Sequence, residues 1–514
     1  MPNQRQISLM KTRILPFFFL HFLLIGCVSY SQQPDFKLLD EYIGKSVKDF
    51  GLTGLSIAIV QKDKVVFTRA YGFADKSKAD VLETRDLFNI ASCTKAFTAA
   101  AIANLVHEGK LKWADPVTDY VPGFAVSDPC ITAMTTIEDL LTHRTGLGTF
   151  YGDELWYQTD YSPEEIISRM RYLPLKNQFR NQFGYQNNMY IIAGEVIEKV
   201  SGLKWSDYIE NNFLFPLSMN QSRTSSVFLD PDQAVAMPHL YGKVQAIYEF
   251  APNPAASMYS SVEDLSNWIR MLLGEGSFEG KQVLAADVVR QMFAGRTTMP
   301  VYPFHESQGT HFRSYALGWF LFDYGGRKIV EHDGGMPGYI SKVCLVPEEE
   351  LGFTILTNDM TGLPDALRNR ILDSFLGKEQ KDWAKEYLAY QQADEQQKKA
   401  DTEQRRNLRV SGTHPSWDPK EFAGTYIDKM YGNAKVNLEN GKLFLRLVPA
   451  GDAFTSEMEH WHFDTWRIKF KDEFLPEGFV TFDFTSNGKP AGFKIDLPNP
   501  DFHFFNLNFR RETN

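Results

Sequence analysis

The chain of 514 residues has a globular composition, with 43% hydrophobic, 14% aromatic and 23% charged residues, which excludes disorder for most of its length. At roughly 100 to 200 residues per domain, this length predicts two to four units, each with its own core. Lys and Arg number 54 and Asp and Glu 64, a formal charge of −10. Because a nucleic-acid binder normally carries the opposite sign, we do not expect nucleic acid as a partner.

Residues 1–31 have the pattern of a secretory signal. Arg5, Lys11 and Arg13 precede an apolar run over 14–26, and the segment contains no acidic residue. The apolar run is shorter than the ~20 residues that span a bilayer, which favours a cleaved signal over a membrane anchor. We therefore expect an exported protein of the periplasm or outer cell envelope.

Two processing routes are open at the end of this signal. Leu24-Ile25-Gly26-Cys27 resembles a lipobox, which would place a lipid anchor on Cys27, whereas Ser29-Tyr30-Ser31 resembles an ordinary small-x-small cleavage site. We favour simple cleavage. The other three cysteines lack the spacing of a disulfide framework, so we predict no disulfide.

Residues 32–377 combine strand-like and helical patterns. Apolar strand patterns occur near 55–60 and 65–67 and again at 316–322, 328–331, 342–346 and 353–358, with helical sequence between them. One antiparallel sheet flanked by helices must therefore be assembled from both ends of an α/β (α+β) domain.

The remaining sequence divides into a linker and a second domain. Residues 378–413 are rich in charge, with Trp383, Tyr387 and Tyr390 at helical spacing, which predicts a linker helix that lays an aromatic stripe on a neighbouring domain. In residues 414–514, apolar and polar side chains alternate with period two, which is typical of strands. Asn440-Gly441 and Asn487-Gly488 predict hairpin turns between them. We expect a separate all-β barrel here.

The strongest catalytic candidate is Ser92-Cys93-Thr94-Lys95, at the start of a helix-forming run. Residues i and i+3 share a helix face, so the Ser92 hydroxyl and the Lys95 amine would project together. A buried, neutral lysine can take the serine proton and make a nucleophile. Two further Ser-x-x-Lys matches, at Ser201 and Ser486, lie in a helix stop and a hairpin turn and lack this setting.

Two later motifs complete the candidate site. In Tyr185-Gln186-Asn187, a nearby lysine cation would acidify the tyrosine, so that its phenolate moves the serine proton. In His332-Asp333-Gly334-Gly335, the glycine pair would let substrate lie against a strand. There the N–H of Gly335 could join that of Ser92 in an oxyanion hole.

These three motifs, in this order, resemble the serine β-lactamase and penicillin-binding-protein superfamily, specifically its class C-like hydrolases and esterases. Other segments share the resemblance: Asp115-Pro116-Val117, Leu140-Leu141-Thr142-His143, Ser257-Met258-Tyr259-Ser260 and Leu317-Gly318-Trp319. The segment that opens at Glu421-Phe422-Ala423-Gly424 resembles the lipocalin-like domain appended to some of these enzymes. The resemblance implies a β-lactamase/transpeptidase-like catalytic domain followed by a lipocalin-like barrel.

The resemblance also implies residue roles. Ser92 would be the acylated nucleophile, Lys95 and Tyr185 the proton-handling pair, and Asn187 a substrate contact, with His332, Gly334 and Gly335 also binding substrate. His332 stands where β-lactamases of the family have the Lys of a Lys-Thr-Gly triad, so a fixed positive charge is replaced by a titratable one. This departure favours the esterase and D-aminopeptidase branch over β-lactam hydrolysis.

The sequence thus predicts an exported serine hydrolase that acts through an acyl-enzyme on an ester or a small amide or D-amino-acid peptide. A DD-carboxypeptidase-like or weak β-lactamase activity is the alternative enzyme. A peptidoglycan-fragment binding or sensing protein without turnover is the alternative outside enzymes. The motifs imply a small-molecule or short-peptide substrate. They imply no metal and no organic cofactor, and they leave the oligomeric state open.

Overall fold

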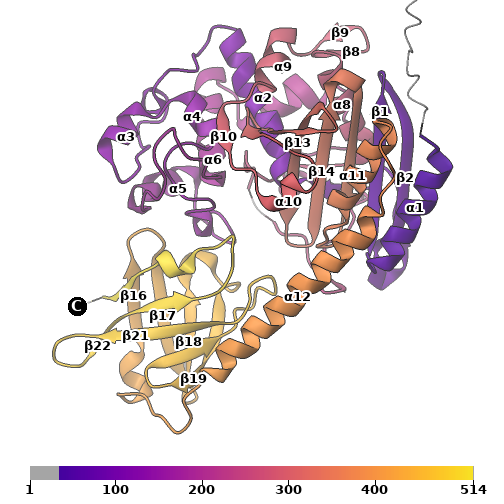
Figure 1. Cartoon of the computed structure of the whole chain (residues 1–514). Coiled ribbons are helices and arrows are strands. Elements are labelled where there is room, and N and C mark those ends of the chain that lie inside the picture. Colours follow the sequence, from indigo (N-terminus) through magenta and orange to yellow (C-terminus); the bar gives the residue numbers. More distant parts are fainter. Residues whose placement is uncertain (1–33, 250, 513–514) are drawn as a thin grey trace, which may run out of the picture.

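The computed structural model describes residues 34–249 and 251–512 (Figure 1). The predicted signal segment and the possible lipid anchor at Cys27 lie outside these residues. Within them, no helix combines the length and the apolar character needed to cross a membrane.

The α/β domain is built on one nine-stranded sheet with the order β10-β11-β12-β13-β14-β15-β1-β2-β3. Its neighbouring strands are antiparallel, and Leu55 of β1 pairs with Thr357 of β15, so the sheet joins both ends of the domain as predicted. The bounds are β1 Gly54–Gln61, β2 Lys64–Asp75, β3 Asp80–Val81, β10 Thr297–Met299, β11 Arg313–Tyr315, β12 Phe320–Tyr324, β13 Arg327–Met336, β14 Tyr339–Val346 and β15 Leu351–Thr357.

Helices cover both faces of this sheet, which explains the continuous apolar sequence of β1. Ile57 and Ile59 pack with α1 (Phe36–Asp49) and α11 (Leu363–Phe375), whereas Ala58 and Val60 face the core that contains α2 (Thr94–His107) and α8 (Val262–Leu273). The other helices are α3 Pro129–Met134, α4 Ile137–Leu141, α5 Pro163–Arg169, α6 Asn187–Ser201, α7 Trp205–Ile209, α9 Ala286–Met292 and α10 Pro303–Glu306.

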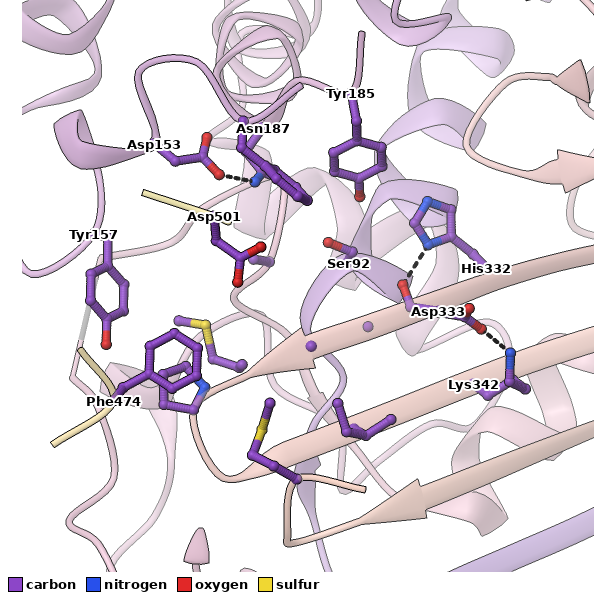
Figure 2. Close-up of a pocket in the computed structure, with 18 of the residues that line it drawn as sticks. Ser92, Asp153, Tyr157, Tyr185, Asn187, His332, Asp333, Lys342, Phe474 and Asp501 are labelled. Atoms are coloured by element: carbon purple, nitrogen blue, oxygen red, sulfur yellow. Dashed lines mark hydrogen bonds and ion pairs between the residues drawn. The ribbon is translucent and has the colours of Figure 1, made fainter. Parts of the chain in front are cut away.

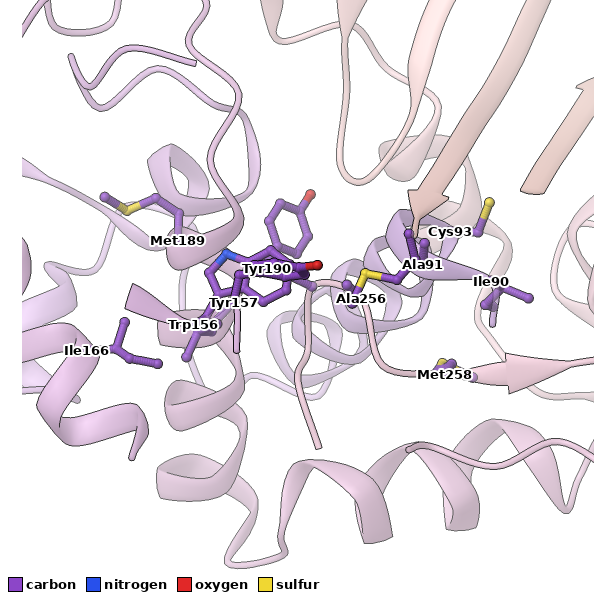
Figure 3. Packing of buried hydrophobic residues seen from close by; sticks show 14 of the residues in the cluster. Ile90, Ala91, Cys93, Trp156, Tyr157, Ile166, Met189, Tyr190, Ala256 and Met258 are labelled. Carbon is purple, nitrogen blue, oxygen red and sulfur yellow. The ribbon is translucent and has the colours of Figure 1, made fainter. Parts of the chain in front are cut away.

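Three two-stranded sheets supplement the large one. They pair β4 (Phe88–Asn89) with β7 (Tyr259–Ser260), β5 (His239–Leu240) with β6 (Lys243–Val244), and β8 (Ser277–Phe278) with β9 (Lys281–Gln282). The first matters most for the site, because β4 leads directly into Ser92. Figure 3 shows Ile90, Ala91 and Cys93 in the same buried cluster as Met258, next to β7.

The strand predicted over 316–322 is only partly present, because β12 begins at Phe320. The preceding residues form a turn in which Ala316 N donates to Trp319 O at 2.8 Å and Gly318 has a φ of +78°. A Cβ on Gly318 would lie 2.9 Å from Lys95 O. Because glycine has no Cβ, this turn can approach α2 closely.

A long helix, α12 (Trp383–Asn407), connects the two parts of the molecule (Figure 1). Trp383 and Tyr387 are buried against α11, and Trp383 Nε1 donates to Asp373 Oδ2 at 2.6 Å. Tyr390, the third residue of the predicted aromatic stripe, is 51% exposed and contacts the ring of Phe304. The first turns of the helix thus fix it to the α/β domain.

The C-terminal domain is a closed barrel of eight strands, as predicted for an all-β unit. Alternate side chains of β18 point inward, and Asn440 and Gly441 both have positive φ in a two-residue hairpin. The strands are β16 Gly424–Asp428, β17 Gly432–Glu439, β18 Lys442–Leu447, β19 Thr455–His462, β20 Thr465–Ile468, β21 Gly478–Phe484, β22 Pro490–Asp496 and β23 Phe509–Arg511.

Candidate active site

Ser92 lies in a single 3₁₀ turn, Ala91–Cys93, that runs into the N-terminus of α2. Ala91 adopts a left-handed φ of +45°, and its N–H donates to Asn89 Oδ1 at 2.7 Å, which stabilises the turn. The Ser92 side chain faces the pocket in Figure 2. Cys93 faces the interior, where its Sγ lies 3.2 Å from His332 O, so it does not compete as a nucleophile.

Lys95 is fully buried one turn after Ser92, with its amine directed at the serine. Its Nζ donates to Ser92 Oγ at 3.0 Å, to Asn187 Oδ1 at 2.6 Å and to Ala255 O at 3.0 Å. Burial lowers the pKa of Lys95 to about 7, although the carboxyl of Asp153 acts in the opposite direction. A substantial fraction of the amine is therefore neutral near pH 7 and able to accept the serine proton.

Tyr185 completes the group around the nucleophile. Its ring lies 4.8 Å from Lys95 Nζ. Burial raises the pKa of Tyr185 well above its usual value, and the nearby Ser92 hydroxyl only partly offsets this. The expected acidification of the phenol by a lysine cation is therefore wrong: the resting phenol is protonated, and Lys95 is the better proton acceptor.

Both the oxygen and the nitrogen of the Asn187 side-chain amide form hydrogen bonds. Besides accepting from Lys95, it donates from Nδ2 to Asp153 Oδ2 at 2.6 Å (Figure 2). Burial raises the pKa of Asp153 to about 7. Asn187 thus positions Lys95 and also lines the pocket, and its expected contact with substrate stays a prediction. Asp153 was missed because its 3₁₀ turn, Asp153–Leu155, carries no motif and meets Lys95 only in the folded chain.

The two glycines on β13 have different environments. A Cβ on Gly334 would lie 2.2 Å from Ser341 Oγ and 2.3 Å from Ile90 O, so this position lets β13 pack against the turn that carries Ser92. A Cβ on Gly335 would meet only Ile340 Cδ1, at 3.7 Å. Both glycines line the pocket, but only Gly335 is exposed.

His332 is 1% exposed, and both of its ring nitrogens have protein partners. Nδ1 donates to Asp333 O at 2.7 Å, and Nε2 accepts from the Tyr315 hydroxyl at 2.9 Å. Burial and the nearby Lys95 lower the pKa of His332 to about 3. The histidine is therefore held neutral, and the expected titratable charge near neutral pH is wrong. It supports the pocket wall beside Tyr185.

Ser92 opens into a pocket of roughly 500 Å³. Residues that sequence reasoning did not single out form much of its wall: Phe150, Asp153, Trp156, Tyr157, Phe183, Phe320, Phe474, Asp501 and Phe502. Phe474, Asp501 and Phe502 come from loops of the barrel. Their role had no signal in the sequence, because it depends on how two domains dock.

This arrangement of sheet, helix and serine turn is that of a β-lactamase/penicillin-binding-protein-like hydrolase. Residues 39–377 match the Beta-lactamase family, and the chain belongs to that family. Residues 408–511 match a domain of unknown function, DUF3471.

Curated relatives match about two thirds of the chain. Unguisins hydrolase ungD of Aspergillus violaceofuscus is 28% identical over 381 residues, which are 67% of this chain and 66% of that protein. Protein flp of Staphylococcus aureus is 25% identical over 325 residues, 62% of each protein. The chain thus spans less than two thirds of the length of these relatives.

Solved structures confirm the fold. The octameric penicillin-binding protein homologue from Pyrococcus abyssi has a TM-score of 0.60 at 22% identity and covers 92% of this chain and 99% of its own. The D-amino acid amidase of Ochrobactrum anthropi has a TM-score of 0.54 at 23% identity, with 66% of this chain and 99% of that chain covered.

Proposed function

We propose that this protein is a serine hydrolase that acylates Ser92 with the acyl group of an ester or a small amide or D-amino-acid peptide. The observation that carries the proposal is the 3.0 Å contact between Lys95 Nζ and Ser92 Oγ, made by an amine whose pKa is about 7. A site that only binds would not need a buried base beside its serine.

The first half of the reaction forms the acyl-enzyme. Neutral Lys95 takes the Ser92 hydroxyl proton while Oγ attacks the carbonyl carbon, and the N–H groups of Ser92 and Gly335 receive the developing oxyanion. The proton then passes, by way of the Tyr185 hydroxyl, to the leaving oxygen or nitrogen. Breakage of that bond releases an alcohol or amine and leaves an ester on Ser92.

The second half returns the enzyme to its starting state. Lys95 accepts a proton from water while the water oxygen attacks the Ser92 ester, and the same proton returns to Ser92 Oγ as the acid departs. Asn187 and Asp153 hold the Lys95 amine in line with the serine throughout. These residues supply every proton movement, so the mechanism requires no cofactor.

The charges at the site support the proposed bond type. His332 stands where a β-lactamase would have lysine and is held neutral, so it offers no fixed cation for a substrate carboxylate. Lys342 also lines the pocket, but it is paired with Asp333 and Asp365. This favours esters and small amides over β-lactams. DD-carboxypeptidase-like or weak β-lactamase activity is the second candidate, favoured by the family membership.

The test is a panel of p-nitrophenyl esters, D-aminoacyl p-nitroanilides and nitrocefin, with Ser92→Ala as the blank. We expect turnover of an ester or anilide and slow or absent turnover of nitrocefin. Rapid nitrocefin hydrolysis by the unmodified protein would overturn the ester and amide preference. We further propose export to the cell envelope, for which the pattern of residues 1–31 is the support.

A further inference from the structure

The barrel supplies one wall of the pocket that contains Ser92. Phe474 lies in the loop between β20 and β21, and Asp501 and Phe502 lie between β22 and β23; all three line the pocket. Figure 2 shows the Asp501 carboxylate directed into the space between Ser92 and Tyr157. A substrate on Ser92 would therefore contact both domains.

Specific contacts fix these loops in place. The rings of Tyr157 and Phe502 stack with centroids 4.4 Å apart, and the Tyr157 hydroxyl donates to Asp472 Oδ2 at 2.9 Å. Within the loop, Asn499 Oδ1 accepts from the N–H groups of Asp501 and Phe502 at 2.8 and 3.0 Å. The interface between the domains thus fixes the position of Asp501.

Asp501 differs from the other three carboxyl groups that line the pocket. Asp153 accepts from Asn187, and Asp333 and Asp365 both pair with Lys342. Over residues 34–249 and 251–512, the structure gives the Asp501 side chain neither a hydrogen bond nor an ion pair. Lys398 acts on it electrostatically, but the Lys398 amine is paired with Asp394 at 2.7 Å.

The Asp501 side chain is partly buried, and burial of a carboxylate is costly unless an opposite charge meets it. Burial raises the pKa of Asp501, as expected for a carboxylate without a cation. The surrounding rings of Tyr157, Phe474 and Phe502 would also favour a cation, through contact with their faces. The site has the chemistry of an ammonium receptor.

We propose that Asp501 and the aromatic barrel loops bind a protonated amine on the acyl part of the substrate, so that the barrel selects amine-bearing acyl donors. This inference rests on the proposed acylation of Ser92 and deepens it by naming a substrate class. Asp501 is a specificity-determining residue on this account, and the reacting groups remain those of the α/β domain.

The test uses boronic acids, which form a reversible adduct with a serine nucleophile and need no turnover. A series of aminoalkyl boronic acids with increasing spacer length is compared with the matching N-acetyl derivatives, in competition with fluorophosphonate labelling of the full-length protein. The quantity measured is the ratio of affinities of the free and acetylated members of each pair. Asp501→Asn is the variant, and Asp452→Asn, an exposed barrel residue paired with Lys471, is the matched control.

We expect the free amine to bind at least roughly tenfold more tightly at one spacer length or more, the scale of one charge-assisted hydrogen bond. This preference should disappear in Asp501→Asn and persist in Asp452→Asn. A ratio near one at every length, or a preference that survives Asp501→Asn, would overturn this inference alone. Failure of every boronate and of the fluorophosphonate to react with Ser92 would overturn the proposed function, and this inference with it.

Discussion

The amine of Lys95 lies 3.0 Å from the Ser92 hydroxyl oxygen and is held there by Asn187, which is itself bound to Asp153. Burial lowers the pKa of the amine because the charged form has lost its water, while Asp153 moderates the shift. The balance leaves a lysine that can exchange a proton near neutral pH. The rate of acylation should therefore report the protonation state of this group.

Acylation should rise with pH through a midpoint near 7 and then level off. The reactive form of Lys95 is the deprotonated amine. Because the pKa of Lys95 is about 7, raising the pH through this value increases the fraction of that form. The measurement is the rate of fluorophosphonate labelling of Ser92 from about pH 5.5 to 9. A rate that falls across this range would contradict the role of Lys95 as the base.

Asp153→Asn tests the origin of that midpoint. The Asp153 carboxylate raises the Lys95 pKa, so its neutral replacement should move the midpoint to lower pH. Because Asp153 also has a pKa near 7, the midpoint of the unmodified protein belongs to the pair. An unchanged midpoint would show that Asp153 does not act on the lysine.

Tyr185→Phe should lower the acylation rate by roughly 10²-fold or more, the usual scale for the loss of a proton-transfer group. The ring and its packing on His143, 4.3 Å away, are kept, so the melting temperature should change little. Stopped-flow ester hydrolysis and thermal unfolding are measured on the same preparation. A near-normal rate would show that Lys95 acts without the tyrosine.

The hydrogen bond between Tyr315 and His332 should be a source of stability. His332→Ala leaves the buried Tyr315 hydroxyl without this acceptor, at a cost of about 1–3 kcal/mol in the free energy of unfolding. Tyr315→Phe and the double variant complete a thermodynamic cycle measured by urea unfolding. A coupling energy of roughly 0.5–3 kcal/mol is expected, and strict additivity would contradict the contact.

Alanine substitutions at Gly334 and Gly335 distinguish a glycine needed for packing from one that faces the pocket. Gly334→Ala would force a Cβ to within 2.3 Å of Ile90 O, a backbone atom, and should destabilise the protein by roughly 1–3 kcal/mol. Gly335→Ala meets only the end of Ile340 and should leave the free energy of unfolding nearly unchanged. Equal loss of stability in both variants would refute this distinction.

Much of the fold was predictable because it follows from local pattern. The i, i+3 spacing of Ser92 and Lys95 places both side chains on one helix face, and the period-two sequence around Asn440-Gly441 produces hairpins of the barrel. The protonation state of His332 was not predictable, because Tyr315 and other neighbours of His332 come from separate strands of the sheet. The same holds for Asp153 and Asp501, whose importance arises only where distant segments pack together.

The most direct test of the account is mass spectrometry of the intact protein and its peptides after reaction with a slowly hydrolysed p-nitrophenyl ester. We predict a single acyl adduct on Ser92, which disappears in Ser92→Ala. The adduct should persist in Ser201→Ala, because Ser201 Oγ instead donates to Ile197 O at 2.7 Å at the end of α6. An adduct on another serine, or turnover that survives in Ser92→Ala, would contradict it.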